Sequence, residues 1–472
     1  MSLRTRAMLA VALTIGFYVL ALGLIAGLIA IVVITHAPGR LLGFCIVGVL
    51  VIAVSIVPRR SRFSPPGPLL NPAGQPRLFA ELEGVARAVG APMPAEVYIT
   101  PEVNAGVLQR GRRRVMVLGL PLMQIMTISQ MRAVLAHEFG HYYGGDTRLG
   151  PWVYRTRETI ERTLRTVSQQ SALLRLPFLW YGRLFMRVSQ AVSRGQELAA
   201  DQLAARTVGA GAMIAGLRNL GQGSIAYNVY WRQEVVPLLE AGFQPPLAEG
   251  FSRFLSEPDV MKEVAAAADS QLAQARTDPY DSHPSDAERI AALATLPPGP
   301  DQGHEPAAIT LMEGVDAIDQ VLLVGMLKPG VKLRAIAWAD AGNIALIPGL
   351  RERVRRQAAM VSDYTVGWLP ELLKFADRLG QSEARAAGAS ITPDRARDMG
   401  IGLAGAALAN TLAQNGWMAE SLPGRPVVMR RGETTLEPFL EVNRLARGEV
   451  DQVAWQRRCV ELGIRDLSLS PV

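Results

Sequence analysis

The sequence predicts a mainly α-helical protein with an N-terminal transmembrane helical hairpin, a helical central domain with a small β-sheet, and a mostly helical C-terminal domain. Three observations lead to this prediction. Two uncharged apolar runs stand near the N-terminus, paired histidines with helical spacing lie in the middle, and Pro- and Gly-rich segments separate the parts. The predicted boundaries are residues 1–60, 61–296 and 305–472.

The composition limits the class of protein. A chain of 472 residues has room for two or three domains, each with a core of its own. It has only two cysteines, and Cys45 lies inside an apolar run, so a disulfide framework is not expected. The net charge of +7 favours acidic lipid as a partner, because much of the arginine stands beside apolar segments. We recognise no nucleic-acid-binding motif and expect no nucleic acid partner.

The two apolar runs predict a membrane anchor. Residues 7–33 carry no charge and are long enough to cross a bilayer core of roughly 30 Å. They are too long for a simple signal peptide, and they lack its cleavage region. Residues 41–57 form a second, shorter run, and the brief connector between the runs predicts a helical hairpin.

Basic residues predict how this hairpin is oriented. They flank the outer ends of both runs, at Arg4, Arg6, Arg59, Arg60 and Arg62, whereas the connector has only Arg40. Because basic flanks remain in the cytoplasm, both ends should face that side. We therefore expect a multi-pass protein of the inner or plasma membrane with everything after residue 60 in the cytoplasm. Gly23 and Gly27 have a spacing that allows helices to pack closely, which leaves a homo-oligomer open.

The central domain begins with a linker, residues 61–77, which is rich in Pro and Gly. Residues 78–90 have helical spacing, and residues 96–100 and 114–118 have the composition of short strands. A helix should then start at Thr127, which forms a capping box with Gln130, and end at Gly144 and Gly145.

That helix carries an H-E-x-x-H motif at His137, Glu138 and His141. Residues four apart lie on one face of a helix, so both imidazoles can reach one tetrahedral zinc ion. Glu138 stands beside them, where its carboxylate can take a proton from a water molecule on the metal. The chain has only five histidines, and two fall in this motif. The alternative is a chance pair of surface histidines.

A zinc enzyme needs a third protein ligand, and the best candidate is Glu197 in the segment SRGQELAADQLAA. Asp201 is four residues further along the same predicted helix, where it can hold a zinc-bound imidazole by its other N–H group. An acidic pair of this kind is otherwise an exposed helix face. Asp146 is a competing acid, but it follows the glycines that end the first helix.

Together these segments carry a resemblance. AVLAHEFGH and SRGQELAAD resemble the membrane zinc metallopeptidase family that includes the heat-shock protease HtpX and the CAAX prenyl protease. The resemblance covers roughly residues 65–295 and implies a helical, gluzincin-like zincin fold, one Zn²⁺ per chain and endopeptidase activity. It also implies that the ligands are His137, His141 and Glu197, with Glu138 as the base and Asp201 behind the ligands.

The resemblance extends to three further residues. The family's H-P…R segment falls on His283 and Arg289, which would lie near the metal and steady the reacting carbonyl or gate the site. Without the resemblance, this segment reads as a helix N-terminus with a surface arginine. Asn104 would lie where an extended substrate pairs with an edge strand.

The stretch between the two ligand helices departs from some relatives, which have further membrane spans there. Residues 173–192 are apolar but are interrupted by three arginines, so we do not expect them to span a membrane. One interpretation is an amphipathic helix on the membrane surface, with Phe178, Trp180 and Phe185 in lipid. The other is an ordinary core helix whose arginines reach solvent.

The C-terminal region has no counterpart that we recognise. It reads as mostly helical, with one hairpin near residues 427–435 and a basic stretch at residues 351–356. The sequence thus predicts a membrane-anchored zinc metalloendopeptidase that acts on protein or peptide substrates at the membrane. The alternative is a catalytically silent zinc-binding scaffold or chaperone-like membrane protein.

Overall fold

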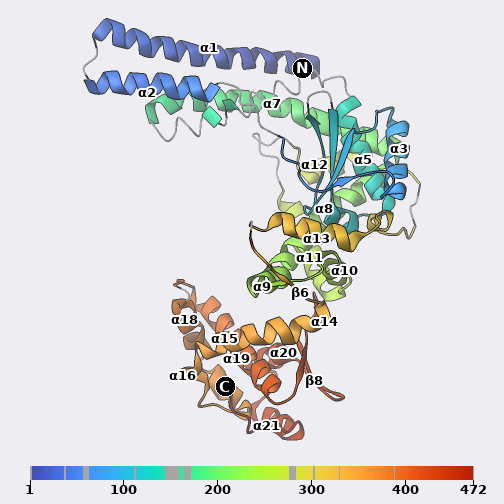
Figure 1. Cartoon of the computed structure of the whole chain (residues 1–472), viewed down its shortest axis with the longest axis vertical. Coiled ribbons are helices and arrows are strands. Elements are labelled where there is room, and N and C mark those ends of the chain that lie inside the picture. Colours follow the sequence, from blue (N-terminus) through green and yellow to red (C-terminus); the bar gives the residue numbers. More distant parts are fainter. Residues whose placement is uncertain are drawn as a thin grey trace. The chain divides into compact units, whose positions relative to one another are not determined.

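The computed structural model describes residues 3–36, 39–56, 63–110, 113–143, 159–160, 162–163, 172–275, 283–300, 303–328, 330–386 and 388–470. The chain folds as two compact units. The first is Met1–Gly223 with Ala266–Glu313, and the second is Ser224–Ala265 with Gly314–Val472. Figure 1 shows the elements of each unit and confirms the mainly α-helical fold class. The three predicted domain ranges stay a prediction.

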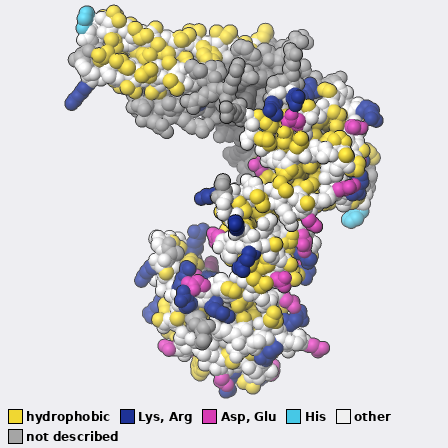
Figure 2. Space-filling view, viewed as in Figure 1, with side chains coloured by type: hydrophobic (Ala, Val, Ile, Leu, Met, Phe, Trp, Pro, Cys, Tyr) yellow, Lys and Arg dark blue, Asp and Glu magenta, His cyan; other side chains and the backbone are white. Residues whose placement is uncertain are grey.

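The N-terminal hairpin consists of α1 (Leu3–Thr35) and α2 (Gly39–Ile56), which pack against each other. Each has a stretch long and apolar enough to cross a membrane, by length and composition. Hydrophobic side chains gather along this hairpin in Figure 2. Ile15 and Val19 are 61% and 64% exposed. So much exposed apolar surface is typical of contact with lipid or with another protein.

A four-stranded sheet follows, with the order β1-β2-β4-β3. Its strands are β1 (Leu69–Leu70), β2 (Glu96–Thr100), β3 (Ala105–Arg110) and β4 (Arg113–Gly119). Strand β2 runs parallel to β4, with Glu96 opposite Val115, while β1 and β3 pair antiparallel with their neighbours. The sequence predicted β2 and β4. It missed the edge strand β3, because Gly, Gln and Arg interrupt the apolar alternation there.

Helices α3 (Pro76–Val89), α4 (Leu120–Ile125) and α5 (Ile128–Tyr143) complete the first half of this unit. The predicted capping box at the start of α5 is present. The backbone N–H of Thr127 donates to the Gln130 side chain at 3.0 Å, and the N–H of Gln130 donates to the Thr127 hydroxyl at 3.3 Å. The glycines expected to end this helix, and the competing acid Asp146, lie outside the described residues.

Helix α7 (Ala172–Thr207) is the longest element of the described chain, and its two ends have different surroundings. Its first half packs against α1, and its second half packs against α5. The membrane-surface interpretation put three aromatic residues of this half in lipid, and for two of them it is wrong. Phe178 and Phe185 are fully buried in the cluster with α1 and α2, whereas Trp180 is 69% exposed.

A docked segment, residues 303–313, returns to the start of α5 after α12 (Asp286–Leu293). Glu305 accepts hydrogen bonds from the Ser129 backbone N–H at 2.9 Å and from its hydroxyl at 2.7 Å. The side chain of Gln75 and the backbone of Glu313 exchange two hydrogen bonds of 2.8 Å. The short 3-10 turn η3 (Ala308–Leu311) lies between these contacts. The start of α5 is therefore capped partly by residues far along the chain.

The second unit is mostly helical, as predicted. It contains the end of α8 (Ala210–Tyr230), the start of α11 (Pro258–Gln274), and helices α9 (Val236–Glu240), α10 (Leu247–Leu255), α13 (Val315–Met326), α14 (Trp338–Ala341), α15 (Ile347–Arg355), α16 (Ala358–Val361), α17 (Leu369–Leu373), α18 (Ala376–Ala386), α19 (Pro393–Gln414), α20 (Pro438–Ala446) and α21 (Gln452–Glu461). Shorter turns are η2 (Trp231–Val235), η4 (Gly342–Leu346) and η5 (Val366–Trp368).

Two small sheets belong to the same unit. Strands β5 (Phe243–Gln244) and β6 (Arg334–Ala335) pair in parallel. Strands β7 (Met418–Glu420), β8 (Val428–Arg431) and β9 (Thr434–Leu436) form an antiparallel sheet. The pair β8 and β9 confirms the hairpin predicted near residues 427–435.

The core of the second unit is centred on α19, which packs closely against α18. Two glycines make this approach possible. A Cβ atom on Gly400 would lie 1.9 Å from the backbone oxygen of Ala376, and one on Gly380 would lie 1.8 Å from that of Ala396. No side chain fits at either position unless the two helices separate.

Candidate metal centre

Three side chains that the sequence singled out converge between α5 and α7. The ligand atoms of His137, His141 and Glu197 all lie within 4.8 Å of one another. The two imidazole Nε2 atoms are 3.2 Å apart. One Glu197 oxygen lies 3.5 Å from Nε2 of His137, and the other lies 3.5 Å from Nε2 of His141.

The local sequence explains this convergence. The two histidines are one helical turn apart on α5, so their rings share a face. Glycine at position 140 lets α7 come close to that face, because a Cβ atom there would lie only 3.2 Å from Cα and Cβ of Ala200. Glu197 is one turn before Ala200 and so reaches the space in front of the imidazoles.

Asp201 and Arg289 form a buried layer behind His137. An Asp201 oxygen lies 2.8 Å from Nδ1 of His137. The Arg289 guanidinium donates two hydrogen bonds to the same carboxylate, at 2.9 and 2.7 Å. All three side chains are buried. Because Asp201 occupies Nδ1, the imidazole presents Nε2 to the site, which is the arrangement that a metal ligand needs. Arg289 touches Asp201, so its contact with the site is indirect.

The remaining candidates lie at the rim or away from it. His283 stands just before α12, and its Nδ1 lies 3.2 Å from a Glu197 oxygen, with 61% of the side chain exposed. Asn104 is exposed at the start of edge strand β3. Its backbone oxygen accepts a hydrogen bond from the N–H of Gly119 at 2.8 Å. The structure thus brings His283 close to the Glu197 carboxylate, and it places Asn104 at the start of edge strand β3.

The buried charges set the protonation states. Burial and the neighbouring charge of His137 together lower the pKa of His141 to about 4, so this ring is neutral at pH 7. Burial also opposes the charged form of His137, but hydrogen bonds to Asp201 and Glu197 outweigh it and raise the pKa to about 9. For Glu197, burial is outweighed by hydrogen bonds from His137 and His283, which hold the pKa well below its usual range.

These features fit a divalent cation. Two bonds of about 2.0–2.1 Å to a tetrahedral ion place their ligand atoms about 3.3 Å apart, close to the separations seen here. One ligand is an ionised carboxylate and one a neutral imidazole. The raised pKa of His137 marks a site whose acids attract positive charge, and a bound cation would take the place of that proton.

Glu138 stands next to these ligands with a different electrostatic character. Burial raises the pKa of this carboxyl group to about 7, and the charge of Glu197 acts in the same direction. A carboxyl group with a pKa near neutrality can both accept and release a proton under physiological conditions.

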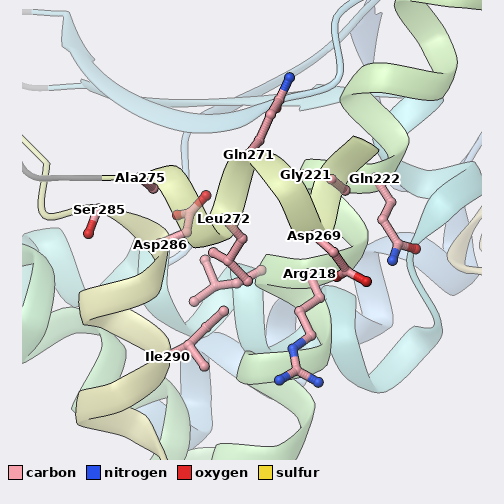
Figure 3. A pocket seen from close by; sticks show the side chains of 12 residues that line it. Arg218, Gly221, Gln222, Asp269, Gln271, Leu272, Ala275, Ser285, Asp286 and Ile290 are labelled. Atoms are coloured by element: carbon pink, nitrogen blue, oxygen red, sulfur yellow. The ribbon is translucent and has the colours of Figure 1, made fainter. Parts of the chain in front are cut away.

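A pocket of about 340 Å³ opens beside α12, between α8 and α11. Figure 3 shows Arg218, Asp269 and Asp286 around it, with Leu272 and Ile290 on its apolar side. Asp286 lies 3.7 Å from the Arg289 guanidinium, which connects this pocket to the layer behind His137. The three candidate metal ligands are not among its lining residues.

Comparison with known proteins now adds to this geometry. Residues 72–296 match the family model described as peptidase family M48. The protease HtpX of Idiomarina loihiensis is 30% identical over 199 residues, which cover 36% of this chain and 69% of that protein. The chain belongs to peptidase family M48. This confirms the resemblance that the sequence motifs indicated.

Membership of the M48 family makes the chain one of a group of metallopeptidases. The match includes the two helices that carry the candidate ligands, the sheet and α12, so the candidate metal centre lies wholly inside the M48 region. It ends at residue 296, before the docked segment and before most of the second unit. No solved structure matches the chain.

Proposed function

We propose that this M48 protein is a membrane-anchored zinc metalloendopeptidase that hydrolyses peptide bonds of membrane or membrane-associated proteins. One Zn²⁺ per chain would be held by His137, His141 and Glu197. The observation that carries the proposal is the convergence of these ligand atoms within 4.8 Å, on a helix that also carries Glu138. Zinc bound there would polarise the scissile carbonyl and make a water molecule more acidic.

Glu138 acts as the general base and then as the general acid. Its carboxylate takes a proton from the attacking water and delivers it to the leaving amine. Without a metal, burial raises the pKa of this carboxyl group to about 7. A nearby divalent charge would favour the carboxylate, which is the form that the first step needs.

The neighbouring residues orient the reacting groups. Asp201 holds the tautomer of His137, and Arg289 holds Asp201, so Arg289 is a positioning residue. His283 is exposed at the rim, where its imidazole can donate to a developing oxyanion. Among the described residues, strand β3 is paired along one edge only, and an extended substrate would add to its other edge beginning near Asn104.

The membrane hairpin would favour substrates that are located at the membrane. Basic flanks place both ends of the hairpin, and therefore the catalytic centre, on the cytoplasmic side. A site tethered in this way meets membrane proteins at a high effective concentration. A homo-oligomer through Gly23 and Gly27 remains a prediction, and both glycines have open space around them.

Glu138→Gln tests the proposed chemistry. The variant should keep one zinc per chain and lose hydrolysis of casein by at least about 100-fold, because the amide cannot accept the proton. Glu83→Gln, an exposed acid on α3, is the matched control and should match wild type. Retained hydrolysis in Glu138→Gln would remove this residue from the base role. Zinc binding without any wild-type hydrolysis would favour the silent scaffold instead.

A further inference from the structure

The first half of α7 runs antiparallel along α1, as two contacts establish. The Tyr181 hydroxyl donates to the backbone oxygen of Leu13 at 2.6 Å. The rings of Phe178 and Phe17 have centroids 6.1 Å apart. Figure 1 shows α7 lying alongside the hairpin. Each step toward the C-terminus of α7 is therefore a step toward the N-terminus of α1.

An exposed apolar stripe lies on the opposite side of this half-helix. Leu176, Trp180 and Leu184 are 50%, 69% and 51% exposed. Their spacing of four residues puts them on one face. The buried face of the same turns packs against α1, whose own outer residues Ile15 and Val19 are also exposed. Both helices of this pair thus carry exposed apolar residues.

One arginine, Arg183, lies beside this stripe, between Trp180 and Leu184. The guanidinium of Arg183 lies over the Trp180 ring, 5.9 Å from its centroid. Counting two residues from the Tyr181 contact, Arg183 is level with Val11, where the membrane-compatible stretch of α1 begins. Tryptophan and arginine are both typical of the membrane interface, where the ring meets lipid and the cation reaches the headgroups.

We propose that the first turns of α7 lie in the cytoplasmic leaflet beside α1, with the stripe of Leu176, Trp180 and Leu184 in contact with lipid. This proposal rests on the proposed membrane anchoring. Ala172 to Arg183 is only about 17 Å of helix, roughly half of a bilayer core, so this part enters one leaflet and does not cross. Lipid is favoured over a second protein copy because Trp180 and Arg183 form an interfacial pair close to the level at which the membrane-compatible stretch of α1 begins.

The part of α7 between Arg183 and Glu197 then limits the distance from the membrane surface to the proposed catalytic centre. Glu197 follows Arg183 by 14 residues on α7, which is at most about 21 Å along the helix axis. An extended chain covers about 3.3–3.6 Å per residue. About six extended residues between the bilayer and the scissile bond should therefore be enough for a membrane-anchored substrate to reach the site.

Fluorescence quenching by lipid tests the contact. The full chain is placed in vesicles of phosphatidylcholine and phosphatidylglycerol with brominated acyl chains, and wild type is compared with Trp180→Phe. The chain has seven tryptophans, so the difference between the two isolates Trp180. Trp368→Phe is the control, because Trp368 is also exposed but lies in the second unit. We expect Trp180→Phe to remove most of the lipid-dependent quenching and Trp368→Phe to leave it unchanged.

Unchanged quenching in Trp180→Phe would overturn the lipid contact. Casein hydrolysis is measured in the same vesicles, so chelator-sensitive activity without Trp180 quenching would reject this inference while leaving the proposed function standing.

A second measurement tests the distance of the proposed catalytic centre from the bilayer. A peptide found to be cleaved in solution is joined to a hydrophobic anchor helix through two or ten residues. The ten-residue substrate should be cut at least about tenfold faster, and equal rates would contradict the stated distance.

Discussion

Two helix pairs in this molecule pack closely at glycine residues, but their contacts enclose different kinds of side chain. In the M48 region, Gly140 brings α5 against α7, and the contact encloses two histidines and two acids. In the second unit, Gly380 and Gly400 bring α18 against α19, and that contact encloses apolar side chains. Close packing at glycine thus brings together candidate metal ligands in one unit and apolar side chains in the other. Substitutions in the first contact should destabilise the protein by leaving a buried charge unpaired. Substitutions in the second should destabilise it by steric overlap.

The largest effect should come from unpairing the charges. In Asp201→Ala, the buried guanidinium of Arg289 loses both of its hydrogen bonds to Asp201. We expect the free energy of unfolding of the first unit to fall by about 3–5 kcal/mol, and zinc affinity to fall about 10–100-fold in whatever folds. Denaturant titration and zinc competition measure the two quantities. Asp286→Ala is the control, since Asp286 lies 3.7 Å from the same arginine. An equal loss in both variants would contradict the assigned pairing.

A buried acid in the second unit gives the next largest effect, through pH. Asp319 accepts a hydrogen bond from the backbone N–H of Ala248 at 3.1 Å, and burial raises its pKa from 3.8 to about 6. The folded state therefore binds this proton more tightly than the unfolded state. Stability from this group is greatest below about pH 4 and is lost as pH rises to about 6, by about 2–3 kcal/mol. Urea titrations from pH 4 to 7 should show this slope in wild type, and Asp319→Asn should abolish it.

Steric overlap at the apolar contact should cost less. A methyl group at Gly400 would meet the Ala376 backbone oxygen at 1.9 Å, so Gly400→Ala forces α18 and α19 apart. We expect a loss of about 1–3 kcal/mol in the second unit. Gly402→Ala is the matched control on the same helix, because its nearest neighbour is the Arg353 guanidinium at 3.6 Å. That variant should be neutral or more stable by about 0.5–1 kcal/mol. Equal thermal shifts in the two variants would reject the close contact.

The smallest effect concerns the N-terminal cap of α5. Glu305→Ala removes the acceptor for the Ser129 backbone N–H and hydroxyl. The first unit should lose about 1–2 kcal/mol. Hydrogen exchange should be faster at the start of α5, while zinc remains bound. Glu313→Gln is the control, because only the backbone of Glu313 meets Gln75. Faster exchange in both variants would mean that the docked segment is released as a whole.

The two helix contacts also differ in how well the sequence predicted them. The convergence of the histidines, Glu197 and Asp201 could be predicted because a metal site needs these residue types at a spacing of four. The role of Arg289 could not be read without the structure, since its partner Asp201 is 88 residues away. The contact between α18 and α19 has no comparable pattern in the sequence. Glycine and alanine in a helix are compatible with many partners, and only the folded backbone shows which atoms meet.

The elements of the fold also differ in whether local sequence patterns predict them. The hairpin, β2, β4 and the start of α5 follow from local patterns, namely apolar length, alternation and a capping box. The edge strand β3 and the docked segment depend on pairing with distant residues, so local patterns do not reveal them. Helix α7 was ambiguous because the partner of its aromatic face, α1, is about 165 residues earlier in the chain.

Metal content tests the central claim most directly. The full chain is purified with and without Glu197→Ala, and bound zinc is measured per chain beside casein hydrolysis. Wild type should hold one zinc, and the variant should retain less than about a tenth of it under the same dialysis and lose hydrolysis. Stoichiometric zinc in Glu197→Ala, or hydrolysis that persists in wild type after complete removal of metal, would contradict the proposed centre.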